Sequence, residues 1–180
     1  MRILVIGQGL AGTLIGYRLE RAGHAVTYVD APAQTAASSV AAGIVNPITG
    51  RRFVKSWRID ELLPVAKALY TELEKELDGR FWYELPLVRT LYNRGDRNDW
   101  QARSADPGYP EYLDDTPTLG RLTDLTAPVF AYAGVRHAAR VDVRELTQRY
   151  RAQLRAKNTL RAEAMDYATL PGLLRDGTYN

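Results

Sequence analysis

The first 30 residues of this 180-residue chain constrain its fold more than any other stretch. Residues 3–6 form a short, unbroken apolar run, which is typical of a strand that is covered on both faces of a parallel sheet. The segment GQGLAG, residues 7–12, follows directly, and a second apolar run over residues 25–29 ends at Asp30. The order strand, glycine-rich turn, helix, strand and acid predicts the start of a Rossmann-type α/β domain.

Each glycine of this turn has its own physical role. Gly7 allows a sharp turn out of the strand, Gly9 leaves room for a diphosphate, and Gly12 permits close packing of helix on strand. The amide groups at the helix start attract phosphate, helped by the helix dipole. Asp30 is placed to accept hydrogen bonds from ribose hydroxyls, and its charge disfavours the 2′-phosphate of NADP. The pattern therefore predicts a dinucleotide site.

Helical periodicity predicts which face of each expected helix is buried. The helix after the glycine turn has an inner face of Ala11, Leu14, Ile15, Leu19 and Ala22. A second helix, capped by Asp60, has an inner face of Leu62, Val65, Ala66, Leu69, Leu73 and Leu77. A third helix starts with Asp142 and Glu145 as a capping pair and buries Val143, Leu146, Tyr150 and Leu154.

The remaining stretches predict strands and loops. Residues 81–93 and 129–135 read as strands from their aromatic and β-branched content, and residues 98–103 begin a short helix. Residues 106–128 carry several prolines and predict a loop with brief elements. Residues 159–165 predict the third strand of the parallel sheet.

Composition removes several classes of function. The formal net charge is +3 and the arginines are scattered, so we expect no nucleic-acid partner. The chain has no cysteine, and its two histidines lack partners at ligand spacing, so we expect no metal site. No apolar stretch approaches membrane-spanning length and no leader precedes the first strand, which predicts a cytoplasmic protein. The sequence leaves the oligomeric state undetermined.

A second motif follows the acid. Residues 31–50 are small and polar, which is typical of a loop, and composition alone leaves a flexible connector as an equal alternative. Within this stretch, residues 38–44 read SSVAAGI and are followed by Asn46 and Pro47. Together with the glycine turn and Asp30, this segment resembles the D-amino-acid-oxidase-like (glycine/sarcosine oxidase-like) family of FAD-dependent oxidoreductases. Both motifs in one chain are more specific than either alone.

The resemblance implies FAD as the cofactor. By this likeness FAD would be held by Gly7, Gly9, Gly12, Asp30, Ser38, Ser39, Ala42, Gly43, Ile44 and Ala164, the last at the adenine end. Many members of the family have Glu at the position of Asp30, and the shorter acid can make the same ribose contact.

The same resemblance implies a domain organisation. Residues 1–50 and 137–180 would form an incomplete Rossmann-type FAD-binding domain, with a parallel sheet and helices. Residues 51–136 would form part of an inserted antiparallel α+β substrate domain. Members of the family are considerably longer, so the likeness covers their N-terminal half and implies a fragment or a truncated product.

The implied activity is oxidation of a C–N bond in a small amine or amino acid by hydride transfer to the flavin. The sequence identifies no catalytic side chain. Arg51, Arg52 and Lys55 could face an anionic substrate, but surface solvation is the stronger explanation. The alternative function is a non-catalytic protein that binds a nucleotide or a partner, and the chain alone need not be active. An NAD-dependent dehydrogenase would share the first 30 residues but gives no reason for the segment 38–43.

Overall fold

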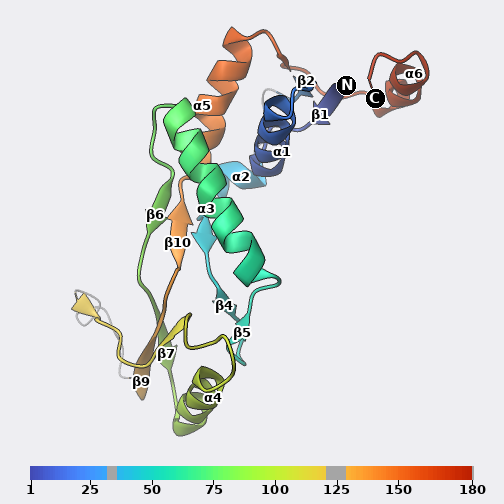
Figure 1. Ribbon diagram of the computed structural model, residues 1–180. Coiled ribbons are helices and arrows are strands. Elements are labelled where there is room, and N and C mark those ends of the chain that lie inside the picture. Colours follow the sequence, from blue (N-terminus) through green and yellow to red (C-terminus); the bar gives the residue numbers. More distant parts are fainter. Residues whose placement is uncertain (32–35, 121–128, 180) are drawn as a thin grey trace. The chain divides into compact units, whose positions relative to one another are not determined.

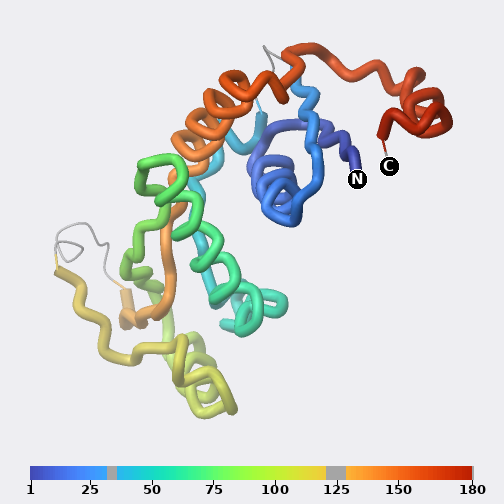
Figure 2. The backbone as a smooth tube through the Cα atoms, turned by 45° about the horizontal axis from the view of Figure 1, so that its top comes forward, coloured from blue at the N-terminus to red at the C-terminus, as the bar shows by residue number. Residues whose placement is uncertain are grey.

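The computed structural model describes residues 1–31, 36–120 and 129–179, and the chain divides into two compact units (Figure 1). The first unit comprises Met1–Ala42 and Asp142–Asn180, and the second comprises Gly43–Val141. Figure 2 traces the two stretches of the first unit, in blue at one end of the chain and in orange to red at the other. The predicted loops at residues 31–50 and 106–128 fall partly outside the described residues.

The first unit is built on a three-stranded parallel sheet in the order β1-β2-β11. β1 (Arg2–Ile6) pairs with β2 (Ala25–Val29), and β2 pairs with the short β11 (Leu160–Arg161). Parallel neighbours need a crossover connection, which α1 (Leu10–Arg21) supplies between β1 and β2. The predicted α/β class, with a parallel sheet and helices, is confirmed.

The buried face of α1 differs in part from the predicted one, because Leu14 and Leu19 are half-buried whereas Ala11, Ile15 and Ala22 are exposed. Its buried residues are Thr13, Gly16 and Tyr17. Ile15 is 58% exposed, so its assignment to the inner face was wrong. A Cβ on Gly12 would lie 1.9 Å from the carbonyl oxygen of Gly7, and one on Gly16 would lie 2.0 Å from the Tyr28 hydroxyl. The helix thus approaches its neighbours through small residues, which periodicity of large apolar residues does not reveal.

α5 (Val143–Ala156) has the inner face that the sequence predicted, because Val143, Leu146, Tyr150 and Leu154 are all buried. Its N-cap is Asp142, whose Oδ1 accepts a hydrogen bond from the Glu145 amide at 3.1 Å. The hydroxyls of Tyr150 and Tyr28 are hydrogen-bonded at 2.9 Å, which ties α5 to β2. Burial raises the pKa of both phenols well above the usual value, so both remain protonated donors.

The other elements of the first unit are short. α2 (Ala37–Val40) lies within the stretch predicted as loop, and it packs against α5. A 3-10 turn (Tyr167–Thr169) follows β11 and leads into α6 (Leu170–Arg175). The side chain of Arg2 donates to the carbonyl of Gly177 at 2.9 Å, so the two ends of the described chain meet in this unit.

The second unit contains antiparallel sheets. One has the order β3-β10-β6, from β3 (Ile44–Val45), β10 (Ala139–Val141) and β6 (Trp82–Glu84). Another has the order β7-β9-β8, from β7 (Leu87–Leu91), β9 (Ala131–Val135) and β8 (Leu113–Asp114). β4 (Ile48–Thr49) pairs with β5 (Val54–Lys55). The strands expected in residues 81–93 and 129–135 are therefore present.

Two helices complete the second unit, α3 (Ile59–Glu76) and α4 (Arg94–Ser104). The prediction that Asp60 caps α3 was wrong. The N-cap is Arg58, which has a φ of 50°, and Asp60 lies inside the first turn with its carboxylate 2.9 Å from Lys55 Nζ. α3 buries Leu69, Tyr70 and Leu73, whereas Leu62 and Val65, at its other end, are 42% and 54% exposed.

A hydrophobic core holds the second unit together. Its buried members are Ile48, Phe53, Ile59, Leu91, Trp100, Tyr112, Leu113, Ala133 and Val135. The boundaries of the units differ from the expected 50/51 and 136/137, because β3, β4 and β10 lie in the second unit. The pairing of β10 with both β3 and β6 explains this assignment. In the described part of the chain, no helix combines the length and apolar character that crossing a membrane requires.

We expect Gly12→Ala to destabilise the first unit by about 2 kcal/mol or more, because its Cβ would overlap the backbone of Gly7. Gly172→Ala in α6 is the matched control, since a Cβ there meets nothing within 4 Å and alanine favours helix. Urea unfolding followed by circular dichroism measures both. Equal midpoints for the two variants would contradict the proposed packing.

Candidate functional site

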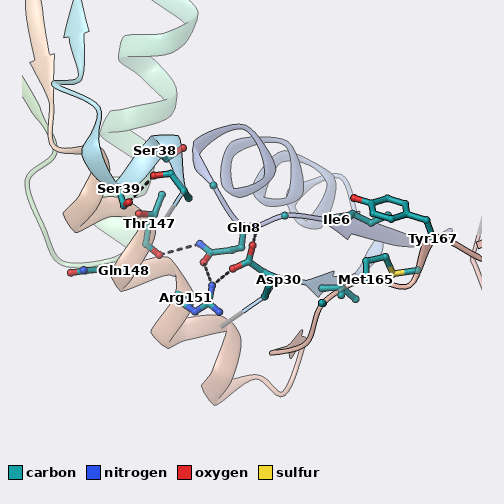
Figure 3. A pocket seen from close by; sticks show the side chains of 16 residues that line it. Ile6, Gln8, Asp30, Ser38, Ser39, Thr147, Gln148, Arg151, Met165 and Tyr167 are labelled. Carbon is teal, nitrogen blue, oxygen red and sulfur yellow. Dashed lines mark hydrogen bonds and ion pairs between the residues drawn. The ribbon is translucent and has the colours of Figure 1, made fainter. Parts of the chain in front are cut away.

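A pocket of about 450 Å³ lies in the first unit, where β1 and β2 end (Figure 3). Its walls come from five separate stretches of the chain: the glycine turn, the end of β2, the segment of α2, α5, and the stretch after β11. The lining residues are Ile6, Gly7, Gln8, Gly9, Val29, Asp30, Ala31, Ala36, Ser38, Ser39, Thr147, Gln148, Arg151, Ala164, Met165 and Tyr167. Ligands of open α/β sheets bind at this edge, outside the carboxyl ends of the strands.

The glycine turn provides open backbone at this pocket. Gly7 has a φ of 91°, which glycine adopts readily, and its amide donates to the carbonyl of Val29 at 2.8 Å. At Gly9 a Cβ would lie 3.0 Å from the Ser38 hydroxyl oxygen, so a side chain would crowd this point. The turn therefore leaves space at the start of α1, where amide groups and the helix dipole favour an anion.

Ser38 contacts the start of α1 directly. Its hydroxyl oxygen accepts a hydrogen bond from the Leu10 amide at 2.9 Å, and its own proton can still be donated into the pocket. The hydroxyl of Ser39, in contrast, donates to the carbonyl of Ala36 at 2.7 Å. Of the two serines, Ser38 is the one placed to contact a phosphate.

Asp30 follows β2 beside the glycine turn, and its carboxylate is held by two donors. Its Oδ1 accepts from the Gln8 backbone amide at 3.0 Å, and its Oδ2 forms an ion pair with Arg151 of α5 (Figure 3). The side chains of Asp30 and Arg151 are 25% and 20% exposed. The carboxylate is therefore fixed in orientation while it still faces the pocket.

The side chain of Gln8 joins the glycine turn to α1 and α5. It is 5% exposed, and its Nε2 donates to the Thr13 hydroxyl at 2.9 Å and to the Thr147 carbonyl at 3.0 Å. Its Oε1 accepts from Arg151 at 3.1 Å. Every polar atom of this buried amide has a partner, which is the condition for burying it without cost.

The structure gathers six of the predicted site residues around the pocket: Gly7, Gly9, Asp30, Ser38, Ser39 and Ala164. Gly12, Ala42, Gly43 and Ile44 do not line it. Gly12 is instead the point of contact between α1 and the turn, as described above. Gly43 and Ile44 belong to the second unit. Their contact with a cofactor stays a prediction.

Gly43 has a clear local role in the second unit. It has a φ of 69°, and a Cβ would lie 1.9 Å from the carbonyl oxygen of Val141. The amide of Val141 donates to the Gly43 carbonyl at 2.8 Å. Glycine is therefore required here by backbone packing between the start of β3 and β10.

Sequence reasoning missed Gln8, Thr147 and Arg151. Gln8 lies in the glycine turn, but the sequence pattern gave a role only to the glycines there. Thr147 and Arg151 are four residues apart and flank the buried stripe of α5, which places them on one side of the helix. A polar pair beside an apolar stripe was the available signal, but only the fold brings that pair to the acid after β2.

A family model described as DAO, FAD dependent oxidoreductase, matches residues 2–164. The chain belongs to this family. The predicted family is thereby confirmed, and so is the predicted cofactor, FAD.

Solved structures share the fold at low sequence identity. Glycine oxidase from Geobacillus kaustophilus matches with a TM-score of 0.66 and 21% identity, over 89% of this chain and 46% of its own. Iminodiacetate oxidase from Chelativorans sp. BNC1 matches with a TM-score of 0.65 and 21% identity, again over 89% of this chain and 46% of its own. L-Amino acid deaminase from Proteus myxofaciens matches with a TM-score of 0.61 and 16% identity, over 88% of this chain and 37% of its own. The chain thus spans less than half the length of these proteins.

The pocket fits the adenosine diphosphate part of FAD. A Cβ on Gly9 would lie 3.0 Å from the Ser38 hydroxyl oxygen, so the missing side chain keeps the backbone open there, as the approach of a diphosphate requires. The Asp30 carboxylate presents acceptor oxygens to the same pocket, of the kind that ribose hydroxyls require. The volume lies within the range of small-molecule sites.

Three cations, Arg51, Arg52 and Lys55, follow the segment 38–44 that resembles the family. Lys55 pairs with Asp60 and lies over the rings of Tyr109 and Tyr112, 5.4 Å and 5.0 Å from their centroids. Arg51 and Arg52 are exposed. These contacts explain Lys55 without a substrate, but through an ion pair and two aromatic rings rather than through the surface solvation expected from the sequence. No group of three or more residues that could hold a metal ion occurs among the residues that the structure describes.

We expect Gly9→Val to weaken FAD binding by about 100-fold or more, because its side chain would enter the diphosphate path and displace Ser38. Gly9 has a φ of −75°, which valine tolerates, so the unfolding midpoint should change little. Flavin fluorescence titration and thermal unfolding measure the two effects. Gly172→Val, outside the pocket, serves as control. Unchanged affinity would refute the assignment of the glycine turn.

Proposed function

We propose that this chain binds FAD in the pocket of its first unit and serves as the FAD-binding part of an oxidoreductase that oxidises a C–N bond of an amine or amino acid. The observation that carries this proposal is the convergence of the glycine turn, Ser38, Asp30 and Ala164 on one pocket. These groups come from stretches separated by as many as 157 positions, from residue 7 to residue 164. Their chemistry matches the successive parts of a dinucleotide.

Each wall of the pocket has a distinct task in this proposal. The bare backbone at Gly9 and the amides at the start of α1 receive the diphosphate, and Ser38 donates its hydroxyl proton to it. Asp30 accepts hydrogen bonds from the ribose. The backbone at Ala164 contacts the adenine end. Ala42, Gly43 and Ile44 are proposed to contact the flavin ring, as the family resemblance implies.

The substrate class follows from the proteins of similar fold. Their names describe oxidation of glycine, oxidation of iminodiacetate and deamination of L-amino acids. All three are small compounds with a nitrogen bonded to carbon, which supports an amine or amino acid as substrate here. When bound, FAD supplies the hydride acceptor, and the protein supplies orientation and exclusion of water. The catalytic side chain is not assigned.

We expect the chain to bind FAD at least about 100-fold more tightly than NADP, because the Asp30 carboxylate accepts from a free ribose hydroxyl and repels a 2′-phosphate. Asp30→Asn should weaken FAD binding about tenfold and reduce the preference for FAD over NADP. Asp176→Asn, outside the pocket, should change neither affinity. Fluorescence titrations with both nucleotides measure this. Tighter binding of NADP by the unaltered chain would overturn the proposed site.

The catalytic part of the proposal has its own test. The FAD-loaded chain is mixed without oxygen with glycine, sarcosine, iminodiacetate and longer amino acids, and loss of the oxidised-flavin absorbance is followed. Bleaching by at least one amine supports the oxidoreductase proposal. Tight FAD binding without bleaching by any amine would show that this chain by itself binds the nucleotide but does not catalyse the oxidation.

A further inference from the structure

Arg151 forms an ion pair with the acid of the proposed ribose site, and it comes from a distant part of the chain. It lies on α5, 121 positions from Asp30, and its Nη1 bonds both to Asp30 Oδ2 and to Gln8 Oε1. It also lines the pocket. One guanidinium therefore joins the ribose-binding acid to the glycine turn, and α5 carries it there.

The setting differs from that of an ordinary surface ion pair. The side chain of Arg151 is 20% exposed and one of its two partners, Gln8, is 5% exposed. On the same helix, Arg149 pairs with Glu145, and both of these side chains are 43% exposed. Exposed pairs of that kind contribute little, whereas a half-buried guanidinium with two fixed acceptors has one preferred arrangement. The contrast marks Arg151 as the arginine that orders the pocket.

Resting on the proposed function, we propose that Arg151 is a cofactor-positioning residue of this chain. It holds the Asp30 carboxylate in the one orientation in which that group accepts a hydrogen bond from the 2′-hydroxyl of the adenosine ribose. It also offsets the negative charge of Asp30 beside the diphosphate.

The lone pairs of Asp30 make this role possible. An ionised carboxylate has about four acceptor positions, and the described contacts use one for the Gln8 amide and one for Arg151. The remaining positions can face the pocket only while the carboxylate plane is held. Without Arg151, Asp30 Oδ2 loses its partner, and the carboxylate is held only by the hydrogen bond that Oδ1 accepts from the Gln8 backbone amide, so it can rotate. The ribose contact would then lose its geometry even though the acid is still present.

The test compares ADP with 2′-deoxy-ADP, binding to the full chain measured by calorimetry. These ligands carry the diphosphate and ribose of FAD but no flavin, so the readout is independent of activity. We expect the unaltered chain to prefer ADP about tenfold, the size of one hydrogen bond to a charged group. Arg151→Met should remove that preference and weaken ADP binding about tenfold or more. Arg149→Met, the same change on the exposed side of α5, should leave the preference for ADP and the affinity for ADP unchanged.

The outcomes separate the proposal from the function on which it rests. If the unaltered chain binds neither FAD nor ADP, the proposed function fails and the role of Arg151 fails with it. If the chain binds ADP but shows no preference, or if Arg151→Met keeps the preference, only the positioning role is overturned. Equal weakening of both ligands, with the preference intact, would indicate a charge effect and also overturn positioning. If Arg151→Met does not fold, the same comparison is made with Arg151→Lys. A partial loss of the preference for ADP over 2′-deoxy-ADP in that variant supports the proposal, and full retention of the preference contradicts it.

Discussion

The contact between Gly12 and Gly7 is the constraint on which the first unit depends. A Cβ at Gly12 would lie 1.9 Å from the carbonyl oxygen of Gly7, so only glycine allows α1 to start so close to the end of β1. This approach places the amides at the helix start beside the bare backbone of Gly9. The absence of a side chain at Gly12 therefore both permits the packing of α1 and brings the helix start to the pocket in which we propose that the diphosphate binds.

A polar network then joins the parts that this contact brings near one another. Gln8 bonds to Thr13 on α1, to the Thr147 carbonyl on α5 and to Arg151, while its backbone amide bonds to Asp30. A buried amide with all its bonds made favours one arrangement, because any other leaves polar atoms unpaired. The Tyr28–Tyr150 hydrogen bond joins α5 to β2 as well. The walls of the pocket are thus held in place by hydrogen bonds within the protein, without a ligand.

Where the sequence predicted buried faces, the outcome depended on what each helix packs against. α5 packs through large apolar residues, so its periodicity identified its inner face correctly. α1 packs through glycines and Thr13, and the same method placed Ile15 inside although it is 58% exposed. At α3 the leucines of the C-terminal half are buried, but Leu62 and Val65 are exposed. Periodicity shows that a helix is amphipathic, whereas the shape of the neighbouring surface decides which residues fit against it.

The sequence by itself determined the features that are local along the chain. Two strands, the turn between the first strand and α1, and the acid after β2 lie within 30 consecutive residues, and their spacing is sufficient to predict a nucleotide site. The tertiary structure alone decided which side chains from elsewhere complete that site. Arg151 and Ala164 reach the pocket because α5 and β11 return to the sheet beside β2, and Gly43 and Ile44 belong to the second unit because β3 pairs with β10. Such pairings depend on contacts between distant residues, and no local pattern in either segment specifies its partner.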